Sequence, residues 1–204
     1  MAEPDFDSKW EGGIWLPKII EKVDHIIYLP KLGAHGVAGY TCGIKNAVGW
    51  LRDDSRLQLH QKGQTFFEKI AEINYFPSIR NKLRFTLTLV HSVLLNIGPE
   101  IGGKYDFDGC IVLASRRLID HDYLASILLP WFDKHDVSFF DLYSPYPDHV
   151  NFWNRKLVKD IWGKEALKHY QPITAYSLSK NMEYDICISH LGWLEGYRPE
   201  RIVV

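Results

Sequence analysis

Residues 25–50 read HIIYLPKLGAHGVAGYTCGIKNAVGW: a short apolar run, a glycine-rich segment, and then apolar residues at helical spacing. The first six residues are largely β-branched and apolar and end in a proline, which is typical of a buried strand. Ile44, Val48 and Leu51 predict a helix, and Thr41 stands where an N-cap residue is expected. A strand, a loop and a helix in succession indicate an α/β fold.

The alternation of strands and helices continues along the chain. Residues 84–90 alternate apolar and polar side chains, as a half-buried strand does, and residues 110–115 form the continuous apolar run of a central strand. The sequence therefore predicts an α/β fold with a mostly parallel sheet flanked by helices, in a single compact domain. The other predicted elements are helices near 66–73, 124–131 and 153–161, turns or loops at 52–56, 98–103 and 141–150, and a short strand at 202–204.

The length and the hydrophobic content set the domain organisation. A chain of 204 residues, of which 46% are hydrophobic, is long enough for one domain with a sizeable core. We expect residues 1–23 to form a loose polar lead-in with a short helix, and residues 24–204 to form the α/β domain.

Charge and hydropathy exclude two classes of partner. The formal net charge is -1 and the basic residues are scattered, so we expect no nucleic acid. The N-terminus lacks the basic and apolar regions of a signal peptide. The most apolar stretch, residues 83–97, contains Arg84 and His91 and is too short to span a bilayer. We therefore expect no membrane association and a cytoplasmic location.

The chain contains three cysteines, Cys42, Cys110 and Cys187, which lie far apart in the sequence. Their spacing fits neither a disulfide framework nor a C-x-x-C motif. An iron–sulfur cluster with four iron atoms needs four thiolates, so this chain alone is not expected to hold one.

The glycine-rich segment suggests a ligand site. A strand, a glycine-rich loop and a helix N-terminus together present free N–H groups and a positive dipole to an anion. Lys45 lies four residues after Thr41, so the two share a helix face that points away from the core. We expect a small anionic ligand at the loop 33–46. The alternative is a tight packing loop with a solvated lysine, because neither a P-loop nor a G-x-G-x-x-G motif is present.

If the protein is an enzyme, Lys45 holds the anion or acts as an electrophile, and His35 or His60 moves protons. These three are the predicted catalytic residues. The predicted ligand-binding residues are Gly36, Gly39, Thr41, Asn46, Arg56 and Gly98.

A transition metal is a further hypothesis. His35 and His60 flank the predicted helix, and a carboxylate such as that of Asp53, Asp54 or Asp122 would complete an open metal site. Of these, Asp122 is the predicted metal ligand. In the alternative interpretation, His35 caps a turn and His60 pairs with a local acid. We expect His121 at the surface, and Cys42 as a small packing residue.

The residues that carry these predictions resemble a known family. The run over 24–60 has an aspartate-led strand ending in P-K, the segment T-x-x-x-K-N at Thr41–Asn46 and a downstream histidine. Gly98-Pro99, VLAS at 112–115 and Asp122 also match. These features resemble domain-of-unknown-function family three-sixty-two, from about residue 24 to the C-terminus. Members usually have a longer N-terminal region, and many carry ferredoxin-like iron–sulfur modules.

Two functional hypotheses follow. The first is an enzyme, or part of one, that binds a small anion at residues 33–46. The alternative is a non-catalytic scaffold or a redox-partner module of an iron–sulfur protein that another chain completes. Because few convincing strands are present, we also expect an exposed apolar sheet face that self-association or a partner chain covers.

Overall fold

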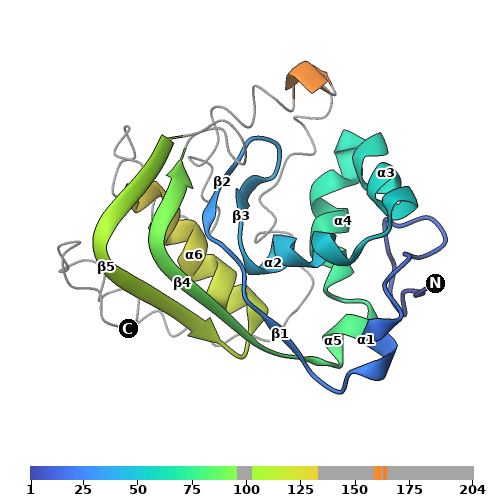
Figure 1. The fold of residues 1–204 in the computed structure, drawn as a ribbon. Coiled ribbons are helices and arrows are strands. Elements are labelled where there is room, and N and C mark those ends of the chain that lie inside the picture. The colour runs from blue at the N-terminus through green and yellow to red at the C-terminus, as the bar shows by residue number, and fades with distance from the viewer. Residues whose placement is uncertain (96–102, 133–158, 162, 165–204) are drawn as a thin grey trace.

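The structure is a computed structural model, and it describes residues 1–95, 103–132, 159–161 and 163–164. Its centre is a five-stranded mixed sheet with helices packed against it (Figure 1). The predicted α/β fold is confirmed. In chain order the elements are α1 (Ile19–Lys22), β1 (Ile26–Tyr28), β2 (Gly33–His35), β3 (Gly39–Thr41), α2 (Gly43–Asn46), the 3-10 helix η1 (Ala47–Trp50), α3 (Asp53–Gln61), the 3-10 helix η2 (Gly63–Thr65), α4 (Phe66–Ile73), α5 (Pro77–Arg80), β4 (Leu83–Leu95), β5 (Gly103–Ser115) and α6 (Leu118–Phe132).

Strand β4 organises the sheet because β1, β2 and β5 all pair with it. β1 and β2 pair with it in parallel, β1 near its beginning and β2 at Leu94 near its end. β5 runs antiparallel to β4, and β3 extends the sheet as the antiparallel partner of β2. Both long strands exceed the predicted runs 84–90 and 110–115. Among the described residues β5 pairs with β4 alone, so the prediction of a central strand at 110–115 was wrong.

The glycine-rich segment, predicted as a loop, forms the β2–β3 hairpin. Strands of three residues are too short to show an alternating pattern, so no strand is predictable here from the pattern of side chains. Gly39 has a φ of 91°, a backbone conformation that glycine adopts without a steric penalty. Thr41 ends β3 instead of capping the helix, and no side-chain cap comes from Cys42, the residue before α2.

Two other segments differ from their predictions. The charged segment 52–56, expected as a turn, leads into α3, whose first turn contains Asp53 and Asp54. Acidic side chains in the first turn stabilise a helix through its dipole. The lead-in 1–23 is not loose: Trp10 is 4% exposed and its indole N–H donates to the Lys69 carbonyl at 3.1 Å. A buried tryptophan can contribute a large apolar area and still satisfy its one donor.

The predicted helices near 66–73 and 124–131 are confirmed as α4 and as part of α6, and the short helix in 1–23 is α1. The predicted loop at 141–150 and strand at 202–204 lie outside the described residues. So do most of the loop at 98–103 and of the helix near 153–161.

Two apolar clusters form the core. The first joins the N-terminal segment and β1 to the helices α2, α4 and α5. The second lies between α6 and the strands β2, β3, β4 and β5. The two clusters adjoin at Gly43, the first residue of α2. Gly43 packs so closely against α6 and β4 that a Cβ atom on it would lie 2.8 Å from Leu118 Cδ1 and 3.1 Å from Thr86 Cγ2.

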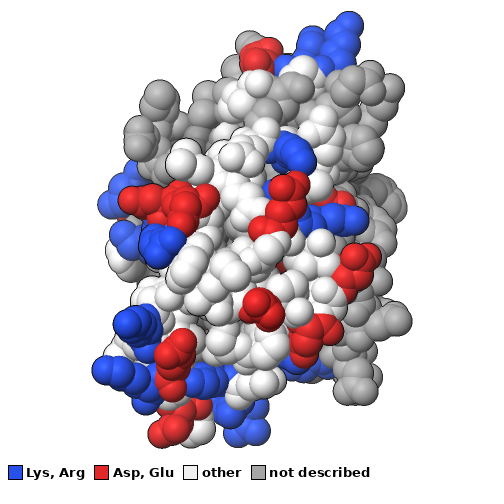
Figure 2. Space-filling model, turned by 90° about the vertical axis from the view of Figure 1, so that its right-hand side faces the viewer, with Lys and Arg blue, Asp and Glu red and all other residues white. Residues whose placement is uncertain are grey.

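The face that carries α3 and α4 presents acidic and basic side chains interspersed among uncharged ones (Figure 2). Within the described part of the chain, no helix combines the length and the apolar character needed to cross a membrane.

Candidate functional site

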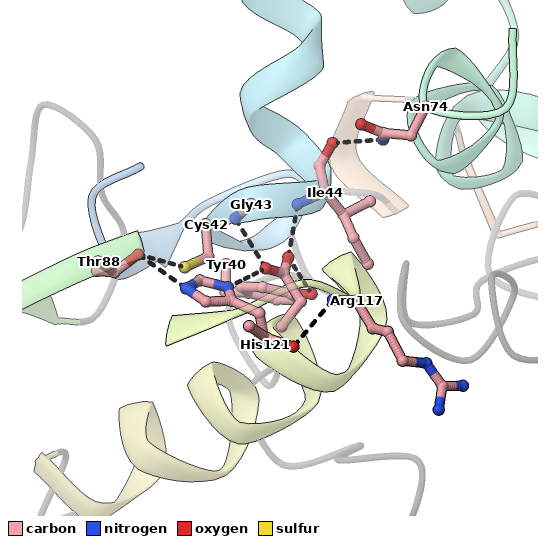
Figure 3. Close-up of polar contacts among 10 residues, drawn as sticks. Tyr40, Cys42, Gly43, Ile44, Asn74, Thr88, Arg117 and His121 are labelled. Carbon is pink, nitrogen blue, oxygen red and sulfur yellow. Dashed lines mark hydrogen bonds and ion pairs between the residues drawn. The ribbon is translucent and has the colours of Figure 1, made fainter. Parts of the chain in front are cut away.

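A buried carboxylate holds the start of α2. Asp122, in α6, is fully buried and accepts hydrogen bonds from the backbone N–H of Gly43 at 2.8 Å and of Ile44 at 2.7 Å. The Tyr40 hydroxyl donates to the same carboxylate at 3.1 Å. In Figure 3 the dashed lines from Gly43 and Ile44 meet at one unlabelled carboxylate, which these hydrogen bonds identify as that of Asp122. Asp122, which is distant in the sequence, thus accepts the hydrogen bonds that an N-cap side chain normally accepts.

The contact requires a glycine at the first position of α2. A Cβ atom on Gly43 would lie 2.6 Å from Asp122 Oδ1 and 2.8 Å from Leu118 Cδ1, closer than real Cβ contacts come. Any side chain at this position would displace the carboxylate of Asp122 or the side chain of Leu118, so Gly43 serves close packing against α6.

The hydrogen-bond network extends from Asp122 through His121 into the sheet. His121 Nδ1 lies 3.0 Å from Asp122 Oδ1, and His121 Nε2 lies 3.1 Å from the Thr88 hydroxyl of β4. That hydroxyl is also 3.8 Å from the thiol of Cys42 (Figure 3). Every one of these side chains is buried. The prediction that His121 lies at the surface was therefore wrong.

This network changes the prediction about the helix N-terminus. The N–H groups at the helix N-terminus were expected to face an external anion, but those of Gly43 and Ile44 donate to a carboxylate of the protein itself. The basic residues around α2 remain as the groups that can meet a ligand.

Lys45 is half-buried, and burial lowers its pKa, with a further lowering from the nearby charge of Arg56. Its amine forms no ion pair with any acid in the described part of the chain. A lysine without an acidic partner in a partly desolvated position is stabilised by an anion from outside.

His35 lies at the end of β2, and its Nδ1 accepts the backbone N–H groups of Val37 and Ala38 at 3.3 and 3.1 Å. It therefore caps its own turn, and the proton of the neutral ring is on Nε2. Burial, together with the nearby charges of Lys45 and His60, lowers the pKa of His35 to about 4. The ring is neutral at physiological pH and can donate from Nε2 without carrying charge.

His60 is exposed on α3, and its Nδ1 lies 2.7 Å from the Arg56 carbonyl. A carbonyl only accepts, so Nδ1 donates and the neutral ring has a free lone pair on Nε2. The predicted partner of His60 was a local acid. The structure instead places the Arg56 carbonyl at its Nδ1 and the ring of Phe66 beside it, with 5.4 Å between the two ring centroids. The electrostatic coupling of Lys45 and His60 to His35 brings the three predicted catalytic residues into one neighbourhood.

The other predicted site residues surround the same hairpin and helix. Gly36 and Gly39 belong to the turn and to β3, and Thr41 and Asn46 are partly buried at the end of β3 and of α2. Arg56 is exposed on α3, and its guanidinium lies 3.4 Å from the Gly49 carbonyl. Gly98 lies outside the described residues.

The predicted metal ligands His35, His60 and Asp122 are not brought together. In the described residues the one group of three donors whose ligand atoms lie within 4.8 Å of one another is Cys42, His121 and Asp122. The physical reason is that Asp122 points to the start of α2 and is held there by two backbone N–H groups. Burial raises the pKa of the Cys42 thiol, and the charge of Asp122 raises it further, so the free thiol is protonated and unreactive.

The sequence analysis missed Tyr40, Thr88 and His121 as members of one network. The alternation over 84–90 pointed away from this network, because it places Phe85, Leu87 and Leu89 on one face, whereas the structure buries Thr86, Thr88 and Val90 on the other.

The fold and the network define an α/β domain with a mixed sheet, in which the carboxylate of Asp122 holds the β2–β3 hairpin and α2. The chain belongs to the family described as Domain of unknown function (DUF362), whose model matches residues 4–126. The match starts within the lead-in and ends in α6, so it includes the whole network around Asp122. Neither a curated protein nor a solved structure matches the chain.

The first prediction tests the Asp122 cap. Asp122→Asn places an NH2 group among donors, so we expect the free energy of unfolding to fall by about 3 to 5 kcal/mol. Urea unfolding at neutral pH measures the loss. Asp53→Asn, an exposed acid in the first turn of α3, is the control and should cost less than about 1 kcal/mol. Equal losses in the two variants would contradict the assigned role.

The second prediction concerns His35 and pH. The pKa of His35 falls from 6.5 to about 4 on folding, so the unfolded chain binds the proton first as the pH decreases. Stability linked to His35 is therefore complete above pH 6.5 and is lost as the pH falls from 6.5 towards 4. At pH 5 the loss is about 2 kcal/mol.

Urea unfolding at pH 7.5 and pH 5 tests this in the wild type and in His35→Gln. The variant should lose about 2 kcal/mol less between the two pH values, because its amide does not titrate. His25→Gln removes an exposed histidine and should follow the wild type. The idea fails if His35→Gln has the same pH dependence as the wild type.

Proposed function

We propose that this protein is a cytoplasmic enzyme, or part of one, that binds a small anionic ligand beside α2, with Lys45 as the main contact. The observation that carries the proposal is the gathering of Lys45, Arg56 and His35 within electrostatic range, without a described acid paired to Lys45. Basic groups that lower one another's pKa are stabilised together when an anion binds among them.

The two histidines support complementary roles in such a site. His35 is neutral and offers an N–H from Nε2, while His60 offers a lone pair on Nε2. A hydrogen-bond donor for the ligand and a proton acceptor on the solvent side are what general acid–base chemistry on an anion needs. Arg56 adds a second positive charge, which favours a ligand with two negative charges, such as a phosphate or a dicarboxylate.

Binding of inorganic phosphate, followed by calorimetry, tests the proposal. Lys45→Met should weaken binding about 10- to 100-fold, the worth of one hydrogen bond to a charged group. Lys31→Met removes an exposed lysine from the segment between β1 and β2 and is the matched control, with unchanged affinity expected. Succinate in place of phosphate separates the two ligand classes. If neither anion binds the wild type, or if both variants bind alike, the site is not at Lys45.

We also propose an interaction surface on the sheet face that the described helices leave exposed. Leu89 and Val112 are cross-strand partners on β4 and β5, and Ile27 lies on the same face; they are 61%, 41% and 60% exposed. Phe85 and Leu87 lie on the same face, so the patch itself is uncharged, whereas the charged residues Arg84, Lys104 and Asp106 of these strands are exposed outside it. A charged group placed on the patch would lose its water without gaining a partner charge. An equally uncharged surface fits best, and a second copy of this chain provides one.

Sedimentation at low micromolar concentration tests the surface. The wild type should dimerise, and Leu89→Lys should shift the chain towards monomer by at least about tenfold in the dissociation constant, because it buries an unpaired charge. Leu57→Lys, in the equally exposed Leu57 of α3, should leave the dimer intact. A monomeric wild type would overturn the proposal that two copies of this chain associate through this face.

A further inference from the structure

We propose that Cys42, His121 and Asp122 form a binding site for one zinc-type divalent metal ion. One ligand atom from each residue lies within 4.8 Å of the others, and all three residues are buried. They come from two elements far apart in the sequence, the residue before α2 and the first turns of α6. The site is separate from the anion site at Lys45 and does not rest on it.

The donor types indicate the class of metal. A thiolate, an imidazole and a carboxylate are the three ligands that Zn²⁺ uses in proteins, whereas Mg²⁺ and Ca²⁺ take oxygen ligands. A sulfur donor also favours zinc and cobalt over manganese. Three protein ligands leave one tetrahedral position for a water or a further ligand.

The proton and charge balance of the site fits a divalent ion. His121 Nδ1 lies 3.0 Å from Asp122 Oδ1, and one proton sits between these atoms when no metal is bound. On metal binding the imidazole proton moves from Nδ1 to Nε2 and the thiol proton of Cys42 is released to solvent, so the metal binds at Nδ1 and at the thiolate. One thiolate and one carboxylate then neutralise the two positive charges, so the buried site carries no net charge.

The surrounding groups already hold the ligands in the orientation that the metal needs. With Nδ1 on the metal, His121 Nε2–H donates to the Thr88 hydroxyl at 3.1 Å, and that hydroxyl can donate to the Cys42 sulfur at 3.8 Å. Tyr40 and the N–H groups of Gly43 and Ile44 fix the carboxylate. Outer hydrogen bonds of this kind orient ligands and raise metal affinity.

Cobalt(II) is the probe, because its absorption reports both tetrahedral geometry and a sulfur ligand. The full chain, purified with chelator, should bind one equivalent of Co²⁺ with a sulfur-to-cobalt charge-transfer band, and Zn²⁺ should displace it. Cys42→Ser should lose the band and bind more than about 100-fold more weakly, since even outer-shell losses reach that size. Cys110→Ser, which changes the exposed cysteine, and Lys45→Met should keep both the charge-transfer band and the affinity for Co²⁺.

A measurement on the wild type keeps the test decisive if Cys42→Ser does not fold. X-ray absorption of the zinc-loaded chain should show one sulfur and otherwise nitrogen or oxygen ligands. No bound metal, a metal without a sulfur ligand, or loss of the band in His35→Ala and His60→Ala instead of Cys42→Ser overturns the proposal.

Discussion

The structure depends on the burial of one carboxylate. Asp122 is fully buried, and an ionised carboxylate without partners would cost far more than a small domain can offset. Two backbone N–H groups, a tyrosine hydroxyl and an imidazole supply the partners. The hydrogen bonds to Asp122 fix where α2 begins and leave room only for a glycine at its first position. They also hold α6 against the hairpin, which joins the two apolar clusters.

The basic residues take their positions from the same arrangement. Lys45 follows the two capped residues directly, so its half-buried place beside Arg56 and His35 is a consequence of how α2 is anchored. The buried network and the solvent-facing basic group therefore share one short helix.

The sequence predicted those parts of the fold whose patterns are regular. Helix α4 repeats its apolar residues at helical spacing, and β4 alternates, so both were found. The β2–β3 hairpin escaped because its strands have three residues each and its glycines gave no side-chain pattern. The site was predicted from local features around Lys45, but Asp122 was grouped with His35 and His60. Nothing local shows that a carboxylate reaches a backbone 79 residues away.

That separation also has a consequence for the order in which the molecule assembles. The N–H groups of α2 are synthesised well before their acceptor, which arrives only with α6. While the chain grows from its N-terminus, the hairpin and α2 exist without the carboxylate that orients them. Long-range contacts of this kind close late and slowly. The emergence of α6 is therefore the step at which the start of α2 gains its hydrogen-bond acceptor.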